Sequence, residues 1–148
     1  MKKSFAPLRH LILFTAIMLS ASSLMAQSAP LDTLLNGKAF TIELQEDMGK
    51  KNKTYPDELS FMKDKLKSKY LTEKKFRSGK FTATPDRTNP NKINFEATMK
   101  NEGGELINFV GTVTGDEIEG TAEWTKKDES TRMMYTFTGE RKVKKGSR

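Results

Sequence analysis

The sequence predicts an all-β protein, a single antiparallel meander of about eight strands that closes into a small barrel. After residue 37, apolar and polar residues alternate with a period of two along most of the chain, as in strands that bury one face. Clusters of Gly, Asn, Asp and Pro separate the alternating runs, and such clusters are typical of hairpin turns. Closure removes the sheet edges that a small protein would otherwise expose, so we favour a barrel over two stacked sheets.

Residues 1–26 have the composition of a secretory signal peptide. Three basic residues and no acidic one accompany the apolar run at 11–19, and the small residues 20–23 follow it. A membrane-spanning helix needs about 20 predominantly apolar residues, and serines interrupt this run too early. We expect cleavage after Ala26, with a second candidate site at 21–23. The mature protein is then exported, periplasmic or extracellular, and has no transmembrane anchor.

The elements of the mature chain are expected in the following order. Residues 27–36 form a lead-in segment with one helical turn at 32–35, the barrel domain covers 37–142, and 143–148 form a basic flexible tail. Alternation predicts strands at 38–46, 57–62, 65–71, 79–84, 92–100, 105–114, 117–125 and 132–141. The pattern breaks between residues 71 and 78, where we expect a helical turn or a corner, with Phe76 closing one end of the barrel.

Two turns predict the register of the last four strands. Gly115 is the first central residue of a two-residue loop, as a type II′ hairpin requires, and residues 102–104 form a three-residue loop that contains glycine. These turns align the apolar residues of neighbouring strands on one face, and a slip of one residue would turn that face outward. The opposed Gly111 and Gly120 then leave a gap flanked by Phe95 and Phe137, which fits either a bend in the closing sheet or room for an aromatic ring, and we favour the bend.

The hairpin at residues 113–120 also carries a family resemblance. Its residues are Val113, Gly115, Asp116, Ile118 and Gly120, followed by Phe137 and Gly139. With the predicted meander, this V-x-G-D-x-I-x-G pattern resembles lipocalin-like (calycin) barrels and small bacterial exported proteins. Arg141 lies where an arginine closes such barrels. The chain departs from the lipocalin G-x-W motif, because Gly37 is followed three residues later by Phe40, one position too far and without the Trp. The resemblance implies that a small apolar molecule binds inside the barrel.

The residue content excludes most catalytic devices. The chain has no Cys, and its one histidine, His10, precedes the expected cleavage site. Thiol and imidazole catalysts, Cys or His zinc sites and disulfides are therefore excluded from the mature protein. No serine has a histidine to activate it, and Glu117 and Glu119 lack the oxygen-rich spacing of a calcium loop. We expect no enzyme, no catalytic residue, no metal and no cofactor.

The charge distribution predicts a dipolar protein, which we expect to be a monomer. The net charge of +7 falls to +4 without residues 1–26, which hold three basic residues and no acid. Residues 50–80 hold eleven Lys or Arg and four acidic residues, whereas residues 102–129 hold eight acidic residues and two lysines. The lysines alternate with residues expected inside and lack exposed aromatic neighbours, so we expect no nucleic acid partner.

Two function classes remain open. The first is binding of a small hydrophobic molecule by inward-facing aromatic residues, whose alternative interpretation is an ordinary filled core. The candidate ligand-binding residues are Phe40, Phe61, Tyr70, Phe95, Phe109, Trp124, Tyr135 and Phe137, with Phe81 also expected inside. The second class is an envelope interaction module, in which a filled barrel docks an acidic protein on the lysine-rich side formed by residues 50–80.

Overall fold

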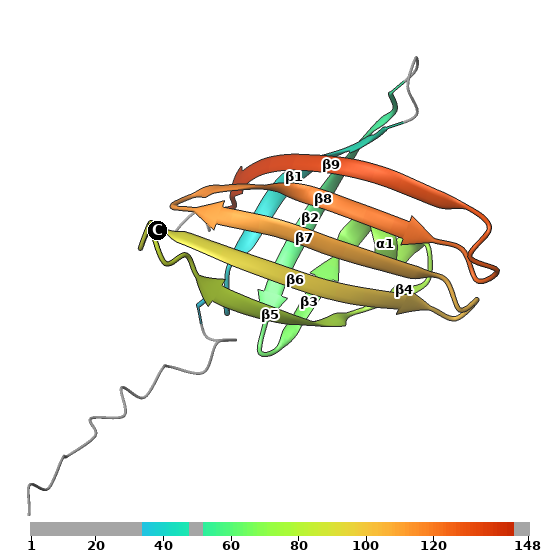
Figure 1. Cartoon of the computed structure of the whole chain (residues 1–148), viewed down its shortest axis with the longest axis horizontal. Coiled ribbons are helices and arrows are strands. Elements are labelled where there is room, and N and C mark those ends of the chain that lie inside the picture. The colour runs from blue at the N-terminus through green and yellow to red at the C-terminus, as the bar shows by residue number, and fades with distance from the viewer. Residues whose placement is uncertain (1–33, 48–51, 144–148) are drawn as a thin grey trace, which may run out of the picture.

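The computed structural model describes residues 34–47 and 52–143, and it contains one short helix among nine strands in that part of the chain (Figure 1). The elements are β1 (Ala39–Glu46), β2 (Thr54–Met62), β3 (Lys65–Ser68), α1 (Lys69–Glu73), β4 (Phe76–Arg77), β5 (Gly79–Pro85), β6 (Lys92–Asn101), β7 (Leu106–Thr114), β8 (Glu117–Thr125) and β9 (Arg132–Arg141). The predicted signal peptide, most of the predicted lead-in segment and residues 144–148 of the predicted tail lie outside the described residues. Residues 34–37 form a turn in which Leu35 is buried.

The strands close into an antiparallel barrel, which confirms the predicted fold. Neighbouring strands follow the order β1-β2-β3-β5-β6-β7-β8-β9, and pairing of β9 with β1 completes the ring. The short β4 pairs with β6 beside β5, so the two act as one interrupted strand of the eight-stranded ring. Figure 1 shows β5 to β9 in front of β1 to β3, with α1 towards one end.

The predicted register of the last four strands is confirmed. Gly115 has a φ of +62° and Gly104 a φ of +87°, so each turn uses a glycine in the left-handed region. Four rows of paired residues cross these strands: Met99, Ile107, Trp124 and Met133; Ala97, Phe109, Ala122 and Tyr135; Phe95, Gly111, Gly120 and Phe137; and Ile93, Val113, Ile118 and Gly139. A Cβ atom on Gly111 would lie 2.8 Å from the ring of Phe95, so phenylalanine fills the space over the glycines.

Phenylalanine rings in mutual contact pack the middle of the barrel. The ring of Phe61 lies 5.1 Å from those of Phe81 and Phe95 and 6.0 Å from that of Phe40, with near-perpendicular planes. Phe137 continues the cluster, since its ring lies 5.8 Å from that of Phe109 and 6.4 Å from that of Phe95. Edge-to-face contacts at these distances are favourable for aromatic rings. Each of these side chains is at most 4% exposed.

The third predicted strand is wrong beyond Ser68, because a helix begins there. The Ser68 hydroxyl accepts a hydrogen bond from the backbone N–H of Leu71 at 3.0 Å, which is the N-cap arrangement that starts α1. Tyr70 therefore lies on α1 and does not point into the barrel as expected. It is half-buried and stacks on Tyr55 with a centroid distance of 5.0 Å.

A β-bulge explains why the alternation breaks before residue 78. Between the Arg77–Lys100 pair and the Phe81–Ala97 pair, the chain of β4 and β5 advances four residues while β6 advances three. The extra residue reverses which side chains face inward. Phe76 is consequently buried, and its ring meets Trp124 edge-on at 5.1 Å, whereas Arg77 faces outward. The inward position of Phe76 agrees with its expected place in the interior, where its side chain is 3% exposed.

Candidate functional site

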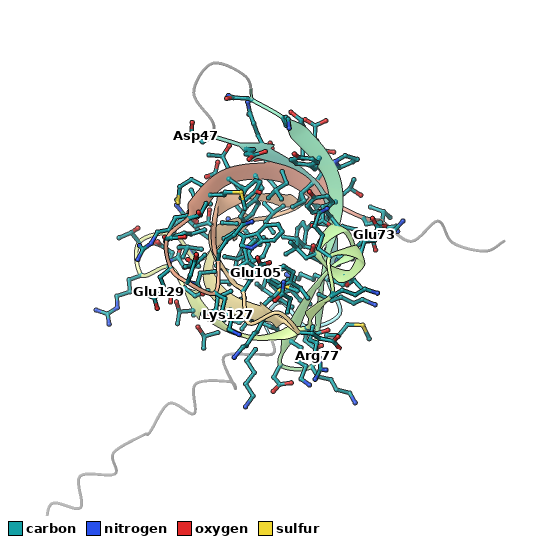
Figure 2. All side chains as sticks on the ribbon, turned by 90° about the vertical axis from the view of Figure 1, so that its right-hand side faces the viewer. Asp47, Glu73, Arg77, Glu105, Lys127 and Glu129 are labelled. Carbon is teal, nitrogen blue, oxygen red and sulfur yellow. The ribbon has the colours of Figure 1, made fainter. Side chains whose placement is uncertain are left out.

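Seven of the eight aromatic residues predicted to bind a ligand point into the barrel. Five are phenylalanines of the central cluster, Trp124 lies against Phe76, and Tyr135 lies in the row next to Trp124. The exception is Tyr70 on α1. Figure 2, which views the barrel from the right-hand end of Figure 1, shows the ring of strands filled with side chains. The five phenylalanines thus contact each other, as in a packed protein core.

Two of these aromatic residues have polar atoms that are poorly satisfied. Trp124 is 9% exposed, and its indole Nε1 is buried without a hydrogen-bond partner. The Tyr135 hydroxyl donates to the sulfur of Met133 at 3.9 Å, which is a weak hydrogen bond. Burial, together with the nearby charge of Glu46, raises the pKa of Tyr135. A buried donor without a partner costs about 1–3 kcal/mol of folding free energy. The polar atoms of Trp124 and Tyr135 are therefore the least well satisfied among the candidate residues.

Two inward-facing acids were missed by the sequence analysis. Glu46 follows Phe40, Ile42 and Leu44 on the inner face of β1 and accepts a hydrogen bond from the Tyr55 hydroxyl at 3.1 Å. Asp57 precedes Leu59 and Phe61 on the inner face of β2. Both are buried, at 7% and 5% exposure. Their signal in the sequence was the same alternation that identified the apolar residues.

Asp57 ties β2 to α1. Its carboxylate accepts hydrogen bonds from the Ser68 hydroxyl at 2.6 Å, from the backbone N–H of Tyr70 at 2.8 Å and from its neighbour Glu58 at 2.7 Å. Burial raises the pKa of the Asp57 carboxyl above its ordinary value, while these hydrogen bonds oppose the shift. Since all its partners are structural, we interpret Asp57 as a latch that holds the helix in place.

The outer side of β3, β4, β5 and β6 carries a group of exposed cations that we call the basic face, defined as Lys65, Lys67, Arg77, Lys80 and Lys100. Lys65 is directly opposite Lys80, and Arg77 is directly opposite Lys100. Like charges in directly opposed positions of a sheet are destabilising. The fold therefore tolerates two unfavourable pairs on one surface, which makes the basic face a candidate binding site.

The acidic counterpart of the basic face lies across the barrel. In the ring of eight strands β8 is four steps from β3 in either direction, and its outward residues include Glu117, Glu119 and Glu123. The charge segregation seen in the sequence thus becomes a separation between two sides of the barrel. On the basic face itself, Glu102 pairs with Arg77 at 3.1 Å, and both side chains are exposed.

Among the open grooves on the outer surface of the barrel, two lie beside features described above. One of about 540 Å³ adjoins the β-bulge and is lined by Arg77, Ser78, Gly79, Thr98, Lys100, Asn101 and Glu102. The other, of about 680 Å³, crosses β5 to β9 over the Gly111–Gly120 pair, and its rim includes Thr82, Thr84, Thr112, Thr121, Thr136 and Thr138. The bulge groove has two cations, Arg77 and Lys100, against one acid, Glu102, and so suits an anion. The threonine-lined groove has one cation, Lys92, against two acids, Glu96 and Glu119.

The described residues contain no group of three or more acidic side chains placed to hold a metal ion. Within the same residues, no helix is long and apolar enough to cross a membrane.

No protein-family model matches the chain, and no curated protein sequence or solved structure shows significant similarity to it. The fold therefore defines the class of protein, which is a closed, antiparallel, eight-stranded β-barrel consistent with a lipocalin-like fold.

Proposed function

We propose that this protein is a non-enzymatic, exported barrel that docks a negatively charged partner of the cell envelope through its basic face. The observation that carries the proposal is the pair of opposed like charges, Lys65 with Lys80 and Arg77 with Lys100. A negatively charged partner relieves this repulsion, most of all at Lys65 and Lys80, because Glu102 already pairs with Arg77 at 3.1 Å in the free protein. The contacts between phenylalanine rings further support a barrel that acts as a rigid scaffold.

Removal of two opposed lysines should weaken binding to a model polyanion. We expect the double variant Lys65→Gln, Lys80→Gln to bind fluorescent poly-glutamate about tenfold more weakly than the native protein, since each exposed ion pair contributes up to about 1 kcal/mol. Fluorescence anisotropy at low salt measures this loss, and rising NaCl should weaken native binding steeply.

The matched control is Lys126→Gln, Lys127→Gln, which removes the same charge from the exposed loop between β8 and β9. This control should retain most of the affinity for poly-glutamate. Equal losses in the two double variants would mean that net charge alone attracts the polymer, and the basic face would then lose its role.

A second candidate function, binding of a small apolar molecule, is favoured by the buried and unpaired Nε1 of Trp124. A ligand that carries a hydrogen-bond acceptor would satisfy this donor within apolar surroundings. Trp124 is the only tryptophan, so its emission reports on its surroundings. A saturable change in emission with micromolar fatty acid or retinoid would support this candidate. Blue emission that no ligand changes would leave Trp124 as a packed core residue.

A further inference from the structure

We infer that the basic face is a peripheral membrane-binding surface whose partner is an anionic phospholipid layer. This inference rests on the proposed function, because it names the chemistry of the negatively charged partner. It depends on a second property of the same surface, the position of exposed apolar side chains.

Each of the two opposed pairs of cations is extended by an exposed apolar residue. Met62 on β2 is directly opposite Lys65 and is 66% exposed, and the row continues to Lys80 on β5. In the second row, Leu106 on β7 is directly opposite Lys100 and is 37% exposed. The two rows therefore read Met62, Lys65, Lys80 and Arg77, Lys100, Leu106. Apolar side chains flank the cations on both sides of the face.

This combination fits the boundary between lipid headgroups and acyl chains. Exposed apolar side chains can enter the outer part of the acyl layer, while lysine and arginine extend their long stems and keep the charge among the headgroups. Each basic residue close to an anionic membrane strengthens binding by about fivefold. An acidic protein would satisfy the cations equally well, but charge alone gives Met62 and Leu106 no role.

The bulge groove provides a place for one lipid phosphate. It adjoins Arg77 and Lys100, and it includes the exposed residue Ser78, whose hydroxyl can donate to a phosphate oxygen. In the free protein the Glu102 carboxylate pairs with Arg77 at 3.1 Å. This carboxylate is negatively charged, as is the lipid phosphate that would take its place beside Arg77. The β-bulge is what turns Arg77 outward to this position. Figure 2 places Arg77 on the outer side of the barrel, away from the filled interior.

The test separates apolar insertion from charge attraction. Binding of the purified protein is measured by flotation with vesicles of phosphatidylcholine alone and with vesicles that contain about 30% phosphatidylglycerol. We expect binding to the anionic vesicles only. The variant Met62→Ser, Leu106→Ser keeps every charge and should lose about tenfold in vesicle affinity without any change in its affinity for poly-glutamate.

The matched control is Met134→Ser, Val110→Ser, which removes two exposed apolar side chains that lie directly opposite acids, Val110 opposite Glu96 and Met134 opposite Glu123. This control should bind vesicles as the native protein does. If Met62→Ser, Leu106→Ser binds anionic vesicles normally, or if the native protein binds poly-glutamate but no vesicles, the lipid partner is wrong and an acidic protein takes its place. Absence of poly-glutamate binding would instead overturn the proposed function.

Discussion

Replacing Gly120 with alanine is expected to destabilise the barrel by about 3 kcal/mol and to lower its Tm by about 10 °C. A Cβ atom at this position would lie 2.3 Å from the carbonyl oxygen of Val110, 2.6 Å from the Cα of Gly111 and 2.7 Å from the ring of Phe137. Two of these atoms belong to the backbone of the neighbouring strand, so a rotamer change cannot relieve the clash. The strands β7 and β8 would have to separate at the middle of their pairing.

Thermal unfolding followed by circular dichroism measures this loss. The control is Gly103→Ala in the loop between β6 and β7, where the added Cβ would meet its nearest atom, Oδ1 of Asn101, at 3.3 Å. That substitution should change the Tm by only a few degrees. A Gly120→Ala protein as stable as the native one would show that β7 and β8 do not approach as closely as the structure has them.

The register of β6 to β9 could be predicted because residues close together in the sequence determine it. Gly115 and the loop at 102–104 fix two hairpins by turn chemistry, and alternation then assigns every residue to a face. Both sources of information gave the same register, and the observed pairs agree with it. Agreement between independent local preferences is what makes a fold readable from one sequence.

The path from β3 to β5 could not be predicted because its causes are distant in the sequence. Asp57 holds the start of α1 through Ser68 and Tyr70, which lie 11 and 13 residues further along the chain. Tyr70 has the spacing of an inward strand residue, but the Ser68 N-cap and the hydrogen bonds to Asp57 together favour a helix in this segment. The β-bulge then inserts one residue before Gly79, where a Cβ would lie 1.8 Å from the carbonyl oxygen of Thr98.

The candidate site was predictable only as a tendency. The excess of lysine in residues 50–80 predicts a basic side of the barrel. Docking of an acidic partner on that side could be predicted from this excess. Which cations oppose each other depends on the pairing of β3 with β5 and of β4 with β6. Neither pairing has a tight turn that sets its register. The contribution of Arg77 was hidden for the same reason, since its outward direction depends on the bulge.

Asp57→Ala should cost about 3 kcal/mol of folding free energy, measured by urea unfolding at neutral pH. The substitution removes the acceptor of three hydrogen bonds and leaves the Ser68 hydroxyl and the Tyr70 N–H without their partner. Both donors lie where α1 meets β2, so the helix should detach from the barrel before the rest unfolds. Loss of the Tyr55–Tyr70 stacking would be the local sign of this detachment.

The variant Asp57→Asn tests how the titration of Asp57 affects stability, through the pH dependence of the free energy of unfolding. Because burial raises the pKa of Asp57 above its ordinary value of 3.8, the folded state holds its proton to a higher pH than the unfolded chain does. The contribution of Asp57 to the free energy of unfolding therefore has its full value below pH 3.8 and falls as the pH rises through the pKa of the folded state. Asparagine does not titrate, so the advantage of the native protein over Asp57→Asn should be greater at pH 3 than at pH 7.

The exposed Asp47, labelled in Figure 2, provides the control, since Asp47→Asn should leave the free energy of unfolding within about 0.5 kcal/mol of the native value. An advantage of the native protein over Asp57→Asn that grows from pH 3 to pH 7 would mean that the folded state stabilises the carboxylate. In that case the hydrogen bonds from Ser68, Tyr70 and Glu58 would outweigh burial, and the pKa of Asp57 would be lowered instead of raised.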